Sequence, residues 1–209
     1  METSAQCVIY NFGIDQAVPL EGTISFAELG HKVGLPENRV RSIVRCSMVS
    51  NIFAEPFPNE VAHTPASALL VHDPPMRDLY GHFLEECFPI TPKLAEAWKR
   101  DPMGVIQNQS AFNVAFNTTD PVFEFLQSFP DRVVRFGGAM TAVSKLPGYS
   151  LDHIVRGYDW GSLNEGGGGG KVVDVRLFFS FSLSVLSHFL KKTNLGWRLY
   201  RLHVHRPCK

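Results

Sequence analysis

The sequence predicts a mainly α-helical protein that begins with a winged helix. Between residues 25 and 63, helix-start signals, a helical repeat of apolar residues and a proline-rich turn follow one another in the order helix, turn, helix, β-hairpin. From residue 73 to residue 163 the apolar spacing is helical, and prolines lie where one helix would end and the next begin. We therefore expect little β structure outside the hairpin and residues 171–175.

Composition and charge limit the class of protein. The chain has 209 residues, of which 44% are hydrophobic and 19% charged, as in an ordinary globular protein. Its formal net charge is zero, so no overall field favours nucleic acid or an anionic membrane. The cysteines are far apart, which fits reduced thiols better than disulfides or a zinc site. Residues 1–4 lack the features of a signal peptide, so we expect a cytoplasmic protein without a metal site.

Capping and spacing signals predict the first helices. Residues 5–18 have the apolar pattern of a helix. Ser25 and Glu28 have the spacing of a capping box, so a short helix should begin there and end near Val33. A second helix should follow Pro36, and four of its residues recur on one face that we expect to be buried: Val40, Ile43, Val44 and Met48.

The winged helix makes DNA binding one alternative function. Residues 52–55 and 60–63 flank the turn 56–59 and complete the hairpin. The second helix carries Arg39, Arg41 and Arg45, which could reach phosphates or guanine edges. The hairpin, however, carries Glu55 and Glu60 and no basic residue, which favours a solvated arginine face and no nucleic-acid partner.

The helical region that follows contains the candidate site residues. We expect helices at residues 74–88, 91–100, 109–116, 121–129 and 131–146, split by Pro89, Pro92, Pro121 and Pro130, and a helix with a loop at 151–163. His82 lies in an otherwise apolar helix. From the sequence alone we interpret it as a histidine on the helix surface, or as a buried histidine whose ring nitrogens are hydrogen-bonded. The phenylalanines of this region read as core: Phe112, Phe116, Phe123, Phe125, Phe129 and Phe136.

The last part of the sequence combines an α/β signal with an unusual tail. A glycine tract at 166–170 precedes a strand at 171–175, although nucleotide-binding folds place the glycines after the strand. Asp174 lies where many α/β enzymes have a cofactor-contacting carboxylate. Residues 176–209 contain seven Lys or Arg and no acidic residue, whereas residues 1–175 contain 13 basic and 20 acidic residues. The apolar segment 177–190 is too short and too polar to span a membrane.

Five stretches resemble one known family in their order and spacing. They are Thr23 to Phe53, Phe116 to Asp120, Pro130 to Met140, Tyr158 to Trp160 and Val172 to Val175. Together they cover roughly residues 5–175 and resemble the winged-helix, SAM-dependent O-methyltransferases of fungal secondary metabolism, relatives of plant caffeate-type enzymes.

The resemblance implies a dimerising, substrate-binding helical region followed by a Rossmann-like domain that binds S-adenosyl-L-methionine (SAM) and carries the catalytic base. It implies a substrate pocket for a small hydroxylated molecule that includes His82, Phe112, Phe116, Phe136 and Met140. It implies that Asp174 belongs to the SAM site. Some members of this fold group are pericyclases with a histidine facing the substrate, in a helix that matches residues 76–88.

The chain departs from the family pattern after Val175, where Arg176-Leu177-Phe178 replaces the glycine turn that approaches SAM. We therefore expect regions at 1–72 (winged-helix dimerisation), 73–165 (helical substrate pocket and dimerisation), 166–175 (remnant first strand) and 176–209 (atypical basic tail). The tail suggests a retained intron or a shifted frame.

Such a chain would be an N-terminal fragment that is inactive alone, has no catalytic base and does not bind SAM. It would form a homodimer or pair with a related methyltransferase. A scaffold protein without catalysis is the other alternative.

Overall fold

The structure, a computed structural model, describes residues 2–106 and 108–159. The chain divides into two compact units, Met1–Tyr149 and Ser150–Lys209, which are described separately. The predictions for the strand at 171–175, for Asp174 and for the tail at 176–209 concern residues outside the described part. Within the described part, helices predominate and three short strands form one sheet.

The predicted first helix at 5–18 is wrong, because the chain forms two helices there. α1 (Glu2–Asn11) ends before Gly13, and α2 (Ile14–Ala17) begins after it. Gly13 has a φ of 63°, a left-handed conformation that glycine adopts without steric cost. The break turns Ile14 into the core and leaves Phe12 48% exposed, so these two residues do not share a face.

The next two helices agree with the sequence prediction. α3 (Phe26–Val33) begins with a complete capping box, in which Ser25 Oγ accepts from the Glu28 amide at 3.2 Å and Glu28 accepts from the Ser25 amide at 3.3 Å. α4 (Glu37–Met48) buries its predicted face. On that face Val40 and Val44 are fully buried, and Ile43 and Met48 are partly buried against the same core.

A three-stranded antiparallel sheet is formed by one strand that precedes α3 and two strands that follow α4. Its strands are β1 (Ile24–Ser25), β2 (Ala54–Phe57) and β3 (Glu60–Ala62), in the order β1-β3-β2. The predicted hairpin is present with a tighter turn, because Phe57 already pairs with Glu60. β1 was not predicted, since a two-residue strand leaves no alternation in the sequence. The classification of this part as a winged helix stays a prediction.

The main core belongs to this N-terminal part. Its buried residues come from α1 to α4, from β1 and β3 and from the segments after α2 and before β2: Ile9, Ile14, Val18, Ile24, Phe26, Leu29, Val40, Val44, Phe53 and Val61. A buried ion pair connects this part to the helices that follow. Asp15 is fully buried and accepts from Arg77 Nε at 2.7 Å, while the Arg77 guanidinium lies 4.7 Å from the centre of the Tyr10 ring.

After the hairpin, the observed helices differ from the prediction in two places. α5 (Pro65–His72) was missed, although Thr64 caps it. From residue 74 the helical backbone continues to residue 100 and changes type instead of splitting at Pro89 and Pro92. The run consists of α6 (Pro74–His82), the π-helix η1 (Phe83–Cys87), α7 (Phe88–Ile90), the 3-10 helix η2 (Thr91–Lys93) and α8 (Leu94–Arg100). Proline has no amide hydrogen for the carbonyl four residues earlier, and the π-helical turn lies directly before Pro89.

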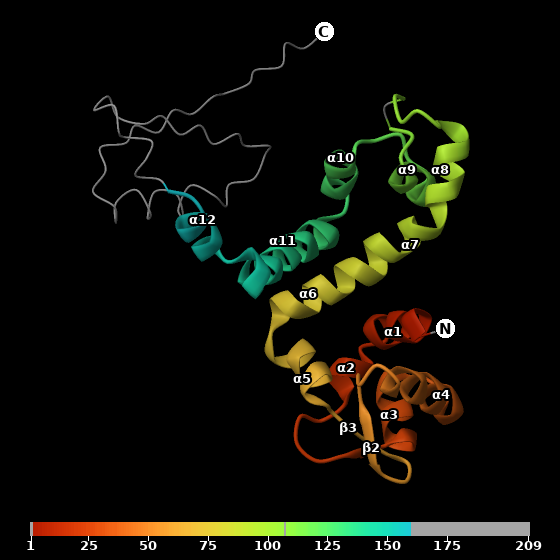
Figure 1. Ribbon diagram of the computed structural model, residues 1–209. Coiled ribbons are helices and arrows are strands. Elements are labelled where there is room, and N and C mark those ends of the chain that lie inside the picture. The colour runs from red at the N-terminus through yellow and green to blue at the C-terminus, as the bar shows by residue number, and fades with distance from the viewer. Residues whose placement is uncertain (1, 107, 160–209) are drawn as a thin grey trace. The chain divides into compact units, whose positions relative to one another are not determined.

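The remaining helices of the first unit return along this run. They are α9 (Ala111–Phe116), α10 (Val122–Gln127), α11 (Pro130–Lys145) and the 3-10 helix η3 (Pro147–Tyr149). The first three agree with the predicted segments to within two residues at each end, and η3 was not predicted. α6 and α11 lie side by side and run in opposite directions (Figure 1). Leu79, Ala139 and Ala142 form a small second core between them.

In the second unit, the described residues contain α12 (Leu151–Gly157), which Ser150 caps. This agrees with the helix and loop predicted at 151–163, of which residues 160–163 lie outside the description. In residues 2–106 and 108–159, no helix has both the length and the apolar character needed to cross a bilayer.

Two neighbouring glycines of α11 test the close packing of this helix against α6. A Cβ atom added at Gly138 would lie 1.9 Å from Asp78 Oδ2 and 2.8 Å from Asp78 Cβ, whereas one added at Gly137 would meet nothing within 4 Å. We expect Gly138→Ala to lower the free energy of unfolding by about 1–3 kcal/mol through overpacking. Gly137→Ala should raise it by up to about 1 kcal/mol through helix propensity. Urea unfolding of both variants measures the difference, and equal effects would contradict the packing described.

The partly buried His63 makes stability depend on pH. Its Nδ1 lies 2.8 Å from Ser67 Oγ and its Nε2 lies 3.1 Å from the Val18 carbonyl oxygen. Burial lowers the pKa of His63 from its usual 6.5, because it disfavours the charged ring. The unfolded chain therefore binds a proton at a higher pH than the folded chain. The contribution to stability is complete above about pH 6.5 and falls as the pH drops toward the lowered pKa.

We expect the free energy of unfolding to decrease between pH 7.5 and pH 5.5, and His63→Gln to show a smaller decrease. Chemical unfolding at the two pH values measures this. His31→Gln, at an exposed position on α3, is the matched control and should keep the decrease of the parent chain. The same pH dependence in His63→Gln as in the parent would contradict the assignment.

Candidate functional site

A buried carboxylate lies where η1 faces α11. Glu86 is 5% exposed, although the other glutamate of η1, Glu85, is more accessible. Arg135 donates to both Glu86 oxygens, with Nε 3.2 Å from Oε2 and Nη2 bonded to Oε1. Arg132 Nη1 lies 3.4 Å from Oε1. A buried charge requires such partners, because an unpaired carboxylate in the interior costs several kcal/mol.

The charges around Glu86 keep it ionised. Burial favours the neutral carboxyl, but the hydrogen bonds from His82 and Arg135 and the positive charges of Arg135 and Arg132 outweigh it. The pKa of Glu86 is therefore below its usual 4.5. At neutral pH the site holds one negative charge beside two fixed positive charges.

His82 lies one helical turn before Glu86 and contacts it. Its Nδ1 is 3.2 Å from Glu86 Oε2, and its Nε2 is 3.8 Å from Cys87 Sγ. The His82 side chain is 18% exposed, and its ring lies at 73° to the Phe136 ring of α11 with 5.4 Å between ring centres. The structure thus brings together His82 and Phe136, two of the residues that the family resemblance placed in a pocket.

Cys87 is a thiol in this setting. Burial raises its pKa above the usual 9.0, and the nearby charge of Glu86 adds to the increase. At neutral pH its sulfur therefore carries a hydrogen that can point toward His82 Nε2, and it has none of the thiolate character of a reactive cysteine.

A phenylalanine cluster lies beside the charged residues. Phe112, Phe116 and Phe125 have ring centres 4.9–5.3 Å apart, and Phe129 lies 4.9 Å from Phe125. The Arg132 guanidinium lies 4.9 Å from the Phe116 ring centre, a cation–π contact. Arg132 therefore joins the aromatic cluster to Glu86.

The other predicted pocket residues are placed less directly. Phe112 and Phe116 belong to the aromatic cluster and not to the His82 contacts. Phe123 lies 6.0 Å from Phe136 and is a second aromatic neighbour of the site. Met140 lies one turn beyond Phe136 on α11 and is 40% exposed. Asp174, the one residue that we predicted to contact SAM, lies outside the described residues.

Sequence reasoning missed the three charged residues of the site. Glu86 follows His82 by four residues, a spacing that places two side chains on the same face of a helix and could have identified the pair. Arg132 and Arg135 come from a helix more than 40 residues away, and no local pattern connects them to Glu86. In the described ranges, no group of three or more His, Cys, Asp or Glu is arranged to hold a metal ion.

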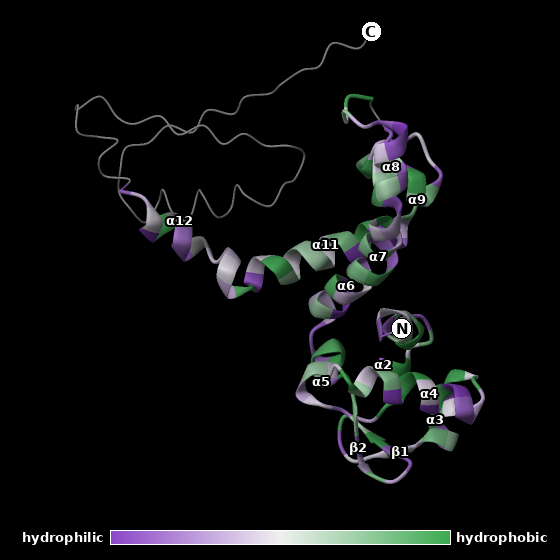
Figure 2. Cartoon of the chain, turned by 45° about the vertical axis from the view of Figure 1, so that its right-hand side comes forward, coloured by the Kyte–Doolittle hydropathy of each residue, from purple (hydrophilic) through white to green (hydrophobic). Residues whose placement is uncertain are grey.

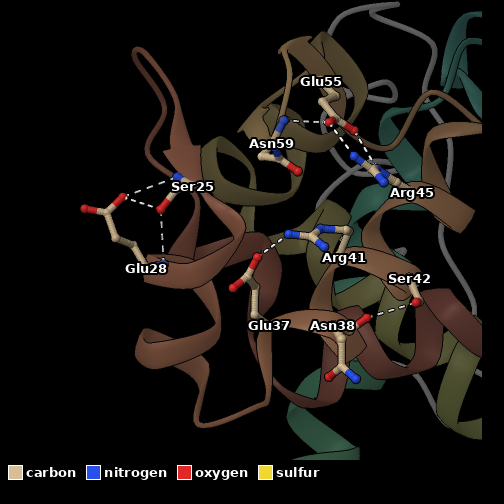
Figure 3. Close-up of polar contacts among 9 residues, drawn as sticks. All are labelled: Ser25, Glu28, Glu37, Asn38, Arg41, Ser42, Arg45, Glu55 and Asn59. Carbon is tan, nitrogen blue, oxygen red and sulfur yellow. Dashed lines mark hydrogen bonds and ion pairs between the residues drawn. The ribbon is translucent and has the colours of Figure 1, made fainter.

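Two of the three arginines of α4, Arg41 and Arg45, are engaged by acidic side chains (Figure 3). Arg45 donates twice to Glu55 of β2, from Nε and Nη2, both at 2.7 Å, and Arg41 pairs with Glu37. The hydrogen bond from Arg45, together with one from the Asn59 amide, lowers the pKa of Glu55 to about 2. A DNA phosphate would have to compete with these carboxylates for the same guanidinium groups.

Comparisons with known proteins identify relatives. No protein-family model matches the chain. The chain is 35% identical to O-methyltransferase aurJ of Gibberella zeae over 155 residues, which are 74% of this chain and 35% of that protein. It is 36% identical to O-methyltransferase bik3 of Gibberella fujikuroi over 165 residues, 79% of this chain and 36% of that protein. The chain thus spans about a third of the length of these relatives.

Solved structures share the fold. OxaC matches with a TM-score of 0.64 at 15% identity, over 96% of this chain and 56% of OxaC. The mitomycin 7-O-methyltransferase MmcR matches with a TM-score of 0.64 at 19% identity, over 95% of this chain and 53% of MmcR. OxaC has also been solved with sinefungin and meleagrin, and LepI, which matches with a TM-score of 0.60 at 16% identity over 98% of this chain and 58% of LepI, has been solved with SAM.

SAM is the cofactor of this group of proteins. The relatives and the shared fold agree with the resemblance seen in the sequence: over about three quarters of its length, this chain is similar to fungal O-methyltransferases.

Proposed function

We propose that this chain forms the substrate-side region of an O-methyltransferase of fungal secondary metabolism. The observation that best supports the proposal is the position of His82, which Glu86 holds beside the Phe136 ring in a chain 35% identical to O-methyltransferases. The ligand would be a small hydroxylated molecule with an aromatic or polyketide-like ring. Its ring would pack against Phe136 and Phe123, and its hydroxyl would bond to His82.

The chemistry of the reaction explains why such a pocket is useful. SAM, when bound, supplies the methyl group that is transferred to a hydroxyl oxygen. The described residues would contribute by orienting that hydroxyl, since a histidine can accept its hydrogen and aromatic rings can fix the plane of the ligand. Phe112 and Phe116 would support this wall through the aromatic cluster.

The chain would be inactive alone. The family follows its Val-Val-Asp-Val strand with a glycine turn, and here Arg176-Leu177-Phe178 stands at that point. Side chains this large would block the approach of the backbone to the methionine part of SAM. We therefore propose that SAM is not bound at this turn and that Asp174 is a remnant of a cofactor site.

A non-catalytic partner role is the second candidate. Large apolar side chains are exposed on α8, α10 and α11, where apolar residues alternate with polar ones (Figure 2): Leu94, Trp98, Phe123, Phe129, Val133 and Val134. Such surfaces are unusual on a monomer and favour association. The chain would pair with a second copy or with a full-length methyltransferase through its first two regions, 1–72 and 73–165, and would remain cytoplasmic.

DNA binding is the weakest candidate. A winged-helix assignment for residues 25–63 would make α4 the recognition helix, but Arg41 and Arg45 are held by Glu37 and Glu55. Binding to duplex DNA that weakens steeply with salt would overturn this ranking.

Ligand binding tests the proposed pocket. We expect 1,3-dihydroxynaphthalene to bind the chain and His82→Phe to weaken binding by about fivefold, because one hydrogen bond contributes about 1 kcal/mol. Val49→Ser, at an exposed position outside the site, should bind like the parent. Fluorescence or calorimetric titration measures the affinities. Equal affinity in His82→Phe, or no binding by the parent, would count against the pocket.

Titration of SAM tests the proposed loss of the cofactor site. We expect no saturable heat when SAM is added to the chain and saturable heat when it is added to a full-length relative under the same conditions. Saturable binding to the chain at micromolar concentration would show that the cofactor site lies elsewhere or is intact.

A further inference from the structure

The contact between His82 and Glu86 determines where the histidine ring carries its proton. Glu86 Oε2 lies 3.2 Å from His82 Nδ1. A carboxylate oxygen and an unprotonated ring nitrogen are both acceptors and would repel each other at this distance. Since Glu86 is ionised, Nδ1 must carry the hydrogen that joins the two atoms.

The other ring nitrogen is then the acceptor of the neutral ring. His82 Nε2 lies 3.8 Å from Cys87 Sγ, and the raised pKa of Cys87 keeps the hydrogen on its sulfur. A thiol is a weak donor, so this contact satisfies Nε2 poorly. A ligand hydroxyl is a stronger donor and would replace the thiol at Nε2.

Glu86 cannot turn away from His82 without losing its other partners. Arg135 bonds to both of its oxygens, and Arg132 lies 3.4 Å from Oε1. The Arg135 side chain is 15% exposed, so solvent does not readily replace the pair. The second acidic group near Arg135, Asp78, lies on α6 against Gly138 and acts on Arg135 only through its charge.

We propose that Glu86, fixed by Arg135 and Arg132, is a positioning residue that holds His82 in the Nδ1–H tautomer and makes Nε2 the acceptor for a ligand hydroxyl. The role of the ligand rests on the proposed function, whereas the tautomer is a property of the chain alone. The consequence is selectivity between a free hydroxyl and its methyl ether. A methoxy group has no hydrogen to donate, so the product of methylation would lose the bond to Nε2.

Nitrogen NMR of the imidazole ring tests the tautomer without any ligand. The chain would be labelled with ¹⁵N-histidine, and His82→Asn would identify the signals of His82. At a pH where the ring is neutral, we expect a protonated Nδ1 and an unprotonated Nε2. A protonated Nε2 in the parent chain would overturn the proposal, and this result requires no variant at Glu86 to fold.

Two variants separate the effect of Glu86 from that of Cys87. Glu86→Gln keeps the size of the side chain but removes its charge, so we expect the Nε2–H tautomer, which free histidine favours, to appear. Cys87→Ala is the matched control on the other side of the ring and should keep the Nδ1–H tautomer. A parent-like tautomer in Glu86→Gln, or an Nε2–H tautomer in Cys87→Ala, would contradict the role of Glu86.

Ligand selectivity completes the test and separates it from the proposed function. In the parent chain we expect 1,3-dihydroxynaphthalene to bind at least about tenfold more tightly than 1,3-dimethoxynaphthalene, and Glu86→Gln to lose most of this ratio. An Nδ1–H tautomer without binding of either ligand would support the positioning role and count against the proposed function. Tight binding of the dihydroxy ligand together with an Nε2–H tautomer would support the proposed function and contradict the positioning role of Glu86.

Discussion

A carboxylate that is almost fully buried needs opposite charges beside it, and the packing of η1 against α11 follows from this requirement at Glu86. Arg135 and Arg132 both come from α11, so the pairing fixes the register of one helix against the other. In the middle of α11, Gly138 lies against Asp78 of α6. Leu79, Ala139 and Ala142 are buried between α6 and α11, so the charge pairs act beside a small apolar core.

The position of His82 depends on the same pairing. Arg135 and Arg132 hold Glu86, and Glu86 holds Nδ1 of the ring. Phe136 on α11 packs against the same ring in a T-shaped pair. The π-helical turn before Pro89 places Glu86 and Cys87 on the two sides of the imidazole. Irregular helical turns of this kind are frequent at functional sites. His82 is thus contacted by three side chains, Glu86 and Cys87 from η1 and Phe136 from α11.

Sequence reasoning predicted local features well and long-range ones poorly. The capping box at Ser25 and the buried face of α4 depend on neighbouring residues, and both agree with the structure. The break at Gly13 was missed because a single glycine inside an apolar pattern does not show its left-handed conformation. His82 was recognised through family resemblance, whereas Arg135 becomes part of the site only when α11 folds back along α6.

The central claim is that Glu86 and Arg135 stabilise the fold as a pair. A double-mutant cycle with Glu86→Gln and Arg135→Met measures this directly through the free energy of unfolding in urea. Each single variant should lose several kcal/mol, because it leaves one charge buried without its partner. The double variant should lose less than the sum of the two by at least about 1.5 kcal/mol. Losses that add to within about 0.5 kcal/mol would show that the two residues act independently and would contradict the account.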